Sequence, residues 1–393
     1  MDLSSITVLD LSQLLPGPYG TQLLAEMGAD VIKIEQPDGG DYSRYTEPTM
    51  DSGQGAVFTA VNRGKESVTL DLKCDEGREA FYRLAAEADV VFEQFRPGVV
   101  DRLGVGYEDV SEYNSEIVYC SLSGYGQTGP YRKRVGHDLN YAGFAGLIDM
   151  TRADEDERPR LPGYPIGDMA GGTFAALSIV GALLSRELGS TGGNYIDISM
   201  TDAVLSFSQA VGVLAMTGQN PRPGKTHLTG KYPCYDVYET ADGRYLTLAA
   251  LEPKFWATLC DELDKPHLLE KHQSGDEAVR TAVRDELAET FRTKDLAAWE
   301  DQLGDVDVMI GRVNTPQEAL EDPHLRERDV IKTGGDGPQR IGFPASVQQG
   351  LDGGKGPVPD LGEHTDSVFR RFGFDDEEIA SLRDAGVVGE SAD

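Results

Sequence analysis

The first half of the chain alternates short apolar runs with longer amphipathic stretches. Residues 6–11 form an apolar run of strand length, and Gly17-Pro18-Tyr19-Gly20 has the composition of a turn. The alternation continues to residue 216 and predicts strands at 31–34, 67–72, 89–93, 117–121 and 195–199, and helices at 21–27, 76–87, 171–188 and 202–216. Strands and helices that alternate in this way predict βαβ units and a parallel sheet.

The pattern changes after residue 216. A segment rich in Pro and Gly is followed by a predicted hairpin at 235–240 and 245–249 and by charged amphipathic helices over 254–303. We therefore predict an α/β fold with a large Rossmann-like parallel-sheet domain at 1–216, a linker at 217–233, a smaller α+β domain at 234–325 and a C-terminal segment at 326–393 that returns to the large domain.

The net charge of the chain limits the kinds of partner that it is expected to bind. The chain carries 67 acidic and 36 basic side chains, and its net charge of −31 is spread along its whole length. Such a field repels nucleic acid and anionic membranes, so neither is an expected partner. Salt screens the self-repulsion of a distributed acidic surface, which indicates the cytoplasm of a salt-adapted organism. No apolar run reaches the roughly 18–20 residues of a membrane span, and the N-terminus lacks the pattern of a signal peptide.

Several cofactor sites are not predicted. The glycines that follow the predicted strands do not form GxGxxG, so a dinucleotide is not expected. The four cysteines lie far apart without a CxxC pair, which favours reduced thiols over a metal or disulfide framework: Cys74, Cys120, Cys234 and Cys260.

Two glycine-flanked polar residues are the main candidates for chemistry. His137 lies in Gly136-His137-Asp138-Leu139-Asn140-Tyr141, and Asp168 follows Gly167 just ahead of the predicted helix at 171–188. An imidazole and a carboxylate in one pocket could serve opposite faces of a single carbon, as a cofactor-independent racemase requires. The residues alone leave two other interpretations open: a hydrogen-bonded core histidine, and an aspartate that caps the helix.

Further motifs extend over nearly the whole chain. They are Leu15-Pro16-Gly17-Pro18, Gly28-Ala29-Asp30-Val31-Ile32-Lys33-Ile34-Glu35, Asn62-Arg63-Gly64-Lys65, Phe95-Arg96-Pro97-Gly98, Ser123-Gly124-Tyr125-Gly126, Gly167-Asp168 and Asp202-Ala203. Through them the chain resembles the superfamily of family III CoA-transferases and α-methylacyl-CoA racemases, the CaiB/BaiF group. The resemblance implies an interlocked homodimer with the active site between one subunit's large domain and the other's small domain.

Within that superfamily, the resemblance is closest to the racemase branch. That branch has a histidine in a Gly-His-Asp-x-Asn-Tyr segment, matched by His137, and a glutamate in a Glu-Pro-x-Phe segment, matched by Glu252. The resemblance therefore implies an α-methylacyl-CoA racemase that uses Asp168 on one face of the α carbon and His137, supported by Glu252, on the other. No cofactor is expected beyond the coenzyme A that the acyl-CoA substrate carries.

Two alternatives stay open at this stage. The first is a CoA-transferase in which Asp168 is a nucleophile that forms an aspartyl-CoA thioester, for example from succinyl-CoA to a small unsaturated dicarboxylate such as mesaconate. The second concerns Glu252, which could instead be a charge at a helix N-terminus.

Residues for binding CoA are also predicted. The cations retained in the motifs are candidates for phosphate pairing and adenine stacking: Lys33, Arg63, Lys65 and Arg96. Tyr125 and Tyr141 are candidates for the pantetheine or acyl channel, and Asp138 for a pantetheine contact. Surface ion pairs, core tyrosines and a capped turn are the respective alternatives. We expect backbone N–H groups at the start of the helix after Asp168 to stabilise the enolate.

Overall fold

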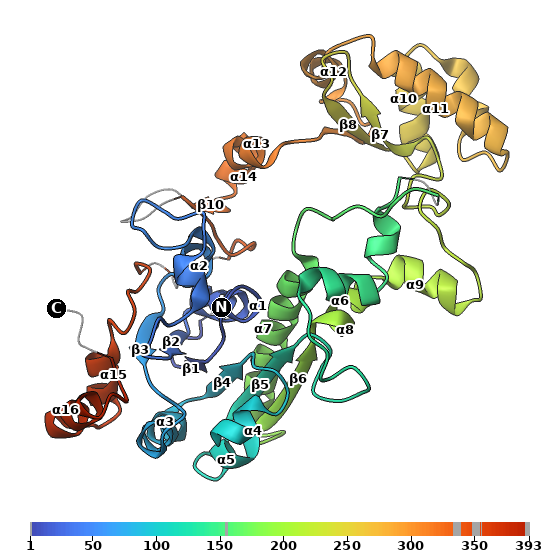
Figure 1. Cartoon of the computed structure of the whole chain (residues 1–393). Coiled ribbons are helices and arrows are strands. Elements are labelled where there is room, and N and C mark those ends of the chain that lie inside the picture. The colour runs from blue at the N-terminus through green and yellow to red at the C-terminus, as the bar shows by residue number, and fades with distance from the viewer. Residues whose placement is uncertain (1, 154–155, 333–338, 348–353, 355, 390–393) are drawn as a thin grey trace. The chain divides into compact units, whose positions relative to one another are not determined.

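The computed structural model describes residues 2–153, 156–332, 339–347, 354 and 356–389 (Figure 1). The chain divides into two compact units. The first unit comprises Met1–Ile148, Leu161–Phe207 and His324–Asp393, and the second unit comprises Asp149–Arg160 and Ser208–Pro323. Residues 149–160 therefore belong to the second unit, although they lie inside the predicted large domain.

A six-stranded parallel sheet forms the centre of the first unit, in the order β3-β2-β1-β4-β5-β6. The strands are β1 (Thr7–Asp10), β2 (Asp30–Glu35), β3 (Glu66–Thr69), β4 (Val90–Glu93), β5 (Val118–Ser123) and β6 (Asn194–Ser199). Val8 of β1 pairs with Val31 on one side and Val90 on the other. Because helices cover both faces of such a sheet, its central strands are almost wholly buried and rich in Val and Ile. The predicted α/β fold with a parallel sheet is confirmed.

Each face of the sheet has its own apolar core. One core includes Leu9, Ile32, Phe81 and Tyr119, together with Phe369 from the C-terminal segment. Its helices are α3 (Asp75–Glu87), α4 (Val99–Leu103), α5 (Tyr107–Ser111), α15 (Thr365–Arg371) and α16 (Asp376–Asp384). The other core lies under α1 (Pro16–Glu26) and α7 (Ile166–Glu187). The remaining elements of this unit are η1 (Tyr42–Tyr45), α2 (Ala56–Val61), α6 (Asp138–Phe144), α8 (Met200–Ser206), β10 (Ile331–Lys332) and β11 (Arg340–Ile341).

Helix α1 begins earlier than the sequence pattern indicates. The predicted turn at Gly17-Pro18-Tyr19-Gly20 is wrong, because these residues form the first turns of α1 with Pro16 at its start. The glycines serve helix packing instead. A Cβ atom on Gly20 would lie 2.9 Å from the carbonyl oxygen of Gly172 in α7, so the two helices cross at backbone contact distance.

Helix α7 is the longest helix among the described residues, with 22 residues. By length and composition alone it could cross a membrane, but half of its most apolar stretch is buried within the protein. It packs against α1, β5 and β6, as a core helix of a sheet protein does. The helix begins at Ile166, five residues before the predicted start at Gly171. Asp168 therefore lies inside its first turn.

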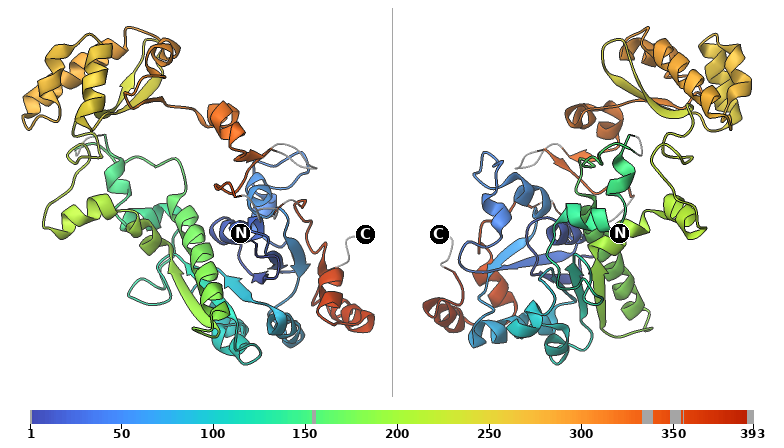
Figure 2. Two further views of the ribbon diagram at one scale, coloured as in Figure 1. Left: turned by 180° about the vertical axis from the view of Figure 1, so that it is seen from behind. Right: turned by 45° about the vertical axis from the view of Figure 1, so that its right-hand side comes forward.

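The second unit is built on a three-stranded antiparallel sheet. Strands β7 (Tyr235–Glu239), β8 (Tyr245–Ala249) and β9 (Ile310–Arg312) pair in that order. Helices α10 (Pro253–Glu262), α11 (Glu277–Phe291) and α12 (Leu296–Leu303), with η3 (Pro266–Lys271), enclose a core that contains Trp256, Leu287, Phe291 and Trp299 (Figure 2). The other elements are η2 (Ile148–Thr151), α9 (Gln209–Met216) and α13 (Pro316–Glu321), while α14 (Pro323–Glu327) begins at the last residue of this unit and continues into the first. The single helix predicted at 202–216 is wrong, because α8 and α9 are separate.

Candidate active site

A pocket of about 670 Å³ opens at the carboxyl edge of the parallel sheet, wholly within the first unit. Its lining comes from the segments that follow β1, β4 and β5 and from the starts of α6, α7 and α8: Leu14, Pro16, Gln94–Pro97, Leu122–Tyr125, Arg132, Arg134–His137, Asn140, Tyr141, Asp168 and Met200. The strand order reverses between β1 and β4. Open α/β sheets bind ligands at this kind of switch point, outside the carboxyl ends of the strands.

The loop after β1 is held in a strained conformation. Leu14, which lines the pocket, has φ of 65°, a left-handed value that is uncommon for a residue with a side chain. The Leu14 backbone N–H donates to both carboxylate oxygens of Asp41, at 3.0 and 3.2 Å. Lys33 Nζ lies 3.0 Å from Asp41 Oδ2 and donates to the Ser12 carbonyl oxygen at 2.8 Å. A buried ion pair therefore fixes this wall of the pocket.

A second buried amine lies under the same edge of the sheet. Lys65 Nζ is 3.1 Å from Asp10 Oδ2, and it also donates to Thr21 Oγ1, at 2.7 Å, and to Asn62 Oδ1, at 2.9 Å. Burial alone would raise the pKa of Asp10, but the ammonium groups of Lys65 and Lys33 outweigh it and hold that pKa at about 2. Burial lowers the pKa of Lys65 to about 8.

These contacts correct part of the predicted CoA site. The ammonium groups of Lys33 and Lys65 have no exposure to solvent and are bound to protein oxygens, so they do not reach a phosphate in the pocket. Lysine in such a site stabilises the fold. Arg63 is also buried and is absent from the pocket lining. Arg96 is different, because it is exposed and lines the pocket.

His137 stands at the mouth of the pocket, immediately before α6. Its backbone N–H donates to Asn140 Oδ1 at 3.0 Å, which fixes the start of the helix. The residue is exposed, so the alternative of a buried core histidine is wrong. Asp168 lines the same pocket from the first turn of α7. The structure thus brings the imidazole and the carboxylate to one pocket, although they are separated by 31 positions in the sequence.

Asp138 joins the two helices that carry these residues. Its Oδ1 accepts hydrogen bonds from the backbone N–H groups of Gly167, at 2.6 Å, and Asp168, at 3.2 Å. Asp138 therefore caps α7 from the neighbouring helix, and it is absent from the pocket lining. The Met169 N–H is also occupied, by the Pro165 carbonyl oxygen. These three N–H groups are not available for an enolate oxygen, in contrast to the prediction for the start of this helix.

The surroundings of Asp168 change its acidity. Burial raises the pKa of its carboxyl group to about 7, and the nearby negative charge of Asp138 adds to the effect. The helix N-terminus would favour the charged form, but burial outweighs it. At neutral pH the group is therefore present in both its protonated and its ionised form, as a residue that donates and accepts protons must be.

Two tyrosines complete the inner wall. The rings of Tyr125 and Tyr141 meet edge to face at 5.2 Å, and the Tyr141 hydroxyl donates to the Gly136 carbonyl oxygen. Burial raises the pKa of Tyr141 to about 12, with the negative charge of Asp168 as a further cause. Gly124 makes room for this ring, because a Cβ atom there would lie 2.2 Å from Tyr141 Cε1. Both tyrosines line the pocket as predicted, while their contact with substrate stays a prediction.

The sequence interpretation missed two cations in the pocket. Arg132 and Arg134 line it beside Arg96, and the Arg134 guanidinium stacks over the ring of Tyr131 at 3.9 Å. The signal was present, since Arg132-Lys133-Arg134 is a basic run in a strongly acidic chain. Three arginines around one pocket can pair with a phosphate-bearing ligand.

Glu252 lies in the second unit, where it is exposed and immediately precedes α10. It occupies the N-cap position, but its side chain forms no capping hydrogen bond. Hydrogen bonds hold the two residues that precede Glu252 in place. His272 Nε2 lies 3.1 Å from the Ala250 carbonyl oxygen, and Gln273 Nε2 donates to the Leu251 carbonyl oxygen at 2.6 Å.

An open parallel sheet with an imidazole, a carboxylate and arginines around one pocket at its carboxyl edge is typical of an α/β protein that binds a ligand there. The family follows from comparison of the sequence. Residues 3–365 match the model of CoA-transferase family III, and the chain belongs to this family.

Its relatives include enzymes of two activities. The chain is 35% identical to a succinyl-CoA:mesaconate CoA-transferase of Haloarcula hispanica, over 94% of this chain and 96% of the relative. It is 32% identical to an α-methylacyl-CoA racemase of Mus musculus, over 99% of this chain and 98% of the relative. Among solved structures, a CaiB/BaiF family protein from Brucella suis superposes with a TM-score of 0.83 at 29% identity, covering 94% of this chain and 99% of that one.

Proposed function

We propose that this protein is an α-methylacyl-CoA racemase, which inverts the configuration at the α carbon of a 2-methylacyl-CoA. One observation carries the proposal: His137 and Asp168 line the same pocket, and burial raises the pKa of Asp168 to about 7. A carboxyl group that titrates near neutral pH can exchange protons in both directions, as an imidazole can. Such a pair supports proton transfer to and from one carbon.

In the proposed reaction, the thioester acidifies the α proton because the enolate oxygen takes up the negative charge. Either His137 or Asp168 removes the proton, and the electrons of the C–H bond move into the enolate. The partner, protonated at that moment, donates its proton to the opposite face of the same carbon. The product is the other enantiomer, and the two side chains have exchanged protonation states. No cofactor takes part, because coenzyme A arrives with the substrate.

The three pocket arginines are the proposed contacts for the CoA moiety. Arg96, Arg132 and Arg134 supply planar guanidinium groups that pair with phosphate oxygens and stack on an aromatic base. Their number matters in a chain with a net charge of −31, since an acidic surface repels a polyphosphate from elsewhere.

The test is deuterium exchange at the α carbon of a 2-methylacyl-CoA in deuterated water without any acceptor acid. The wild-type protein should exchange the proton and racemise the substrate. His137→Ala and Asp168→Asn should each lower the rate by about 10²-fold or more. His267→Ala is the matched control, because His267 is an exposed histidine of the second unit that pairs with Glu286. Full exchange in the His137→Ala variant would refute the proposal.

A CoA-transferase is the second candidate, favoured by the 35% identity to a succinyl-CoA:mesaconate CoA-transferase. In that reaction the Asp168 carboxylate attacks the thioester carbon and expels CoA thiolate, which gives a mixed anhydride. The thiolate then forms an aspartyl-CoA thioester and releases the donor acid, and the acceptor carboxylate takes over the CoA in the same two steps. This route needs Asp168 ionised. Transfer from succinyl-CoA to mesaconate, with no α-proton exchange, would establish it.

We further propose that the protein is a homodimer in which Glu252 acts with His137. Exposed apolar side chains on the described surface of α7 support an interface, including Leu177 and Leu184. Light scattering after size-exclusion chromatography measures the mass. Co-expression of His137→Ala and Glu252→Ala chains then tests whether sites are shared. Mixed dimers regain activity if each site takes the two residues from different chains, and stay inactive if both residues come from one chain.

A further inference from the structure

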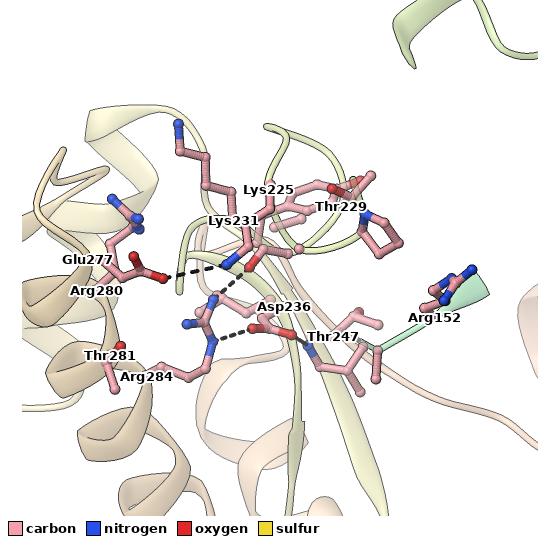
Figure 3. Close-up of a pocket in the computed structure, with 18 residues that line it drawn as sticks. Arg152, Lys225, Thr229, Lys231, Asp236, Thr247, Glu277, Arg280, Thr281 and Arg284 are labelled. Atoms are coloured by element: carbon pink, nitrogen blue, oxygen red, sulfur yellow. Dashed lines mark hydrogen bonds and ion pairs between the residues drawn. The ribbon is translucent and has the colours of Figure 1, made fainter. Parts of the chain in front are cut away.

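A second pocket, of about 890 Å³, lies entirely in the second unit (Figure 3). It is enclosed by the segment before β7, by the strands β7 and β8, and by the first half of α11. The reaction proposed above assigns it no part. Its charge sets it apart, because five of its lining residues are basic and two are acidic, in a chain where acids outnumber bases by 67 to 36.

Three of these cations are already compensated, and one of them is Arg152, whose Nη2 lies 2.7 Å from Asp149 Oδ1 outside the lining. Arg284 Nε lies 2.8 Å from Asp236 Oδ2, and Lys225 Nζ lies 3.5 Å from Glu277 Oε1. Figure 3 shows both pairs across the pocket. These two pairs use both acidic residues of the lining.

Lys231 and Arg280 have no such partner. Among the described residues, no carboxylate lies within ion-pair distance of either group. The Lys231 ammonium contacts the ring of Tyr232, 5.2 Å from its centroid. Arg280 Nη1 donates to the carbonyl oxygens of Ser274, at 3.0 Å, and Gly275, at 2.8 Å, which fixes the guanidinium in place but leaves its charge uncompensated. Both residues are half-buried.

The rest of the lining has a different character. Tyr235, Leu248 and Ala249 present carbon atoms from the two strands, and Thr229 and Thr281 add hydroxyl groups. Apolar walls suit the carbon skeleton of an organic molecule, and cations together with hydroxyl groups suit a carboxylate. An inorganic ion alone would leave the apolar wall without a contact.

We propose that this pocket binds a small organic acid through its carboxylate, with Lys231 and Arg280 as the charged contacts. In a protein of net charge −31, two cations without carboxylate partners are expected to attract an anionic ligand to this place. The proposal does not depend on racemisation in the first unit.

Calorimetric titration with succinate tests it, in KCl at a concentration where circular dichroism shows the protein folded. Succinate should bind, and succinamide, the neutral analogue, should not. Lys231→Ala should weaken succinate binding by about tenfold or more, the usual result of removing one charged hydrogen-bond donor. Lys231→Arg should retain most of the affinity. Lys294→Ala is the matched control, because Lys294 is an exposed lysine of the same unit outside the pocket.

Three results would overturn the proposal. They are no binding of succinate by the wild-type protein, equal binding of succinate and succinamide, and undiminished binding by a folded Lys231→Ala variant. Titration with inorganic phosphate tests whether the cations bind a phosphate group and not a carboxylate. Phosphate binding without succinate binding would give that result. Because α-proton exchange is assayed separately, failure of either proposal leaves the other standing.

Discussion

Asp138 Oδ1 accepts a hydrogen bond from the backbone N–H of Asp168 at 3.2 Å, and it also raises the pKa of the Asp168 carboxyl group. One carboxylate therefore helps to fix the position of the other and adds to the rise in its pKa, of which burial is the larger cause. Asp138 directly follows His137, so the contact also couples the two proposed acid–base residues through the chain.

Replacement of Asp138 by Asn should shift the pH dependence of α-proton exchange. The amide oxygen can still accept the N–H bonds of α7, but the negative charge is gone, so the pKa of Asp168 falls below about 7. The limb of the pH–rate profile that reports Asp168 should move to lower pH, while burial keeps the pKa above its ordinary value. Asp101→Asn removes an exposed carboxylate of the same unit and should leave the profile in place. An unshifted limb in Asp138→Asn would contradict this coupling.

Asp168 should also make the protein less stable as pH rises. The pKa of its carboxyl group is about 7 in the folded chain and near the ordinary 3.8 in the unfolded chain. Between these values the folded state holds a proton that the unfolded state has lost, so this stabilisation is complete below about pH 4 and is lost as pH rises through 7. Asp168→Asn should therefore melt a few degrees above the wild type at pH 8, with a smaller difference at pH 5. Scanning calorimetry at the two pH values measures both differences.

Gly124→Ala should damage the inner wall of the pocket. The added methyl group would overlap the ring of Tyr141, and overpacking of this kind costs about 1–3 kcal/mol of unfolding free energy. The exchange rate should fall as well, because the ring lies beside Asp168. Gly143→Ala is the matched control, since a Cβ atom at this helical glycine meets nothing within 4 Å. Equal denaturation midpoints for the two variants would show that the ring moves aside freely.

Substitution of Lys33 should lower the stability of the fold, whereas substitution of Arg96 should weaken CoA binding. Lys33→Met breaks a fully buried ion pair and leaves Asp41 uncompensated, which costs about 3–5 kcal/mol. Arg96→Ala should change stability by no more than about 0.5 kcal/mol, because the residue is exposed, yet raise KM for acyl-CoA. Denaturant unfolding and steady-state kinetics on both variants provide the comparison. A normal midpoint for Lys33→Met would contradict the structural role of this lysine.

The melting temperature should rise with KCl concentration. A net charge of −31 destabilises the compact state through self-repulsion, and added salt screens that repulsion. Thermal unfolding followed by circular dichroism from 0.1 to 3 M KCl checks the trend. A melting temperature that does not change with KCl would argue against adaptation to high salt.

The centre of the sheet could be predicted from the sequence because its central strands are buried on both faces and form short apolar runs, such as Val90-Val91-Phe92. The start of α1 could not be predicted from the sequence. Gly17 and Gly20 have the composition of a turn, but the Gly17 N–H donates to Gln94 Oε1 and Gly20 meets the backbone of α7, and both of these partners are far away in the sequence. Local composition contains no record of such a contact.

The candidate site also contains residues whose place could be predicted from the sequence and residues whose place could not. His137, Asp168, Arg96 and both tyrosines were found because they belong to sequence motifs, and the fold brings them to one pocket. Lys33 and Lys65 belong to motifs too, but their partners Asp41 and Asp10 become neighbours only when the strands pair. A conspicuous lysine in an acidic chain can thus be either a ligand contact or a buried counter-ion, and burial decides between them.

The path of the chain has a consequence for biosynthesis. Strand β3 forms the edge of the sheet, and its backbone is tied to the far C-terminal part: Thr69 N–H donates to Thr365 Oγ1 at 3.1 Å, and the Ser67 carbonyl oxygen accepts from His364 N–H at 2.9 Å. The second unit is translated between these partners. A ribosome-bound nascent chain must therefore keep one apolar flank of the sheet uncovered until the last helices emerge, and premature termination after Pro323 should give an aggregating product.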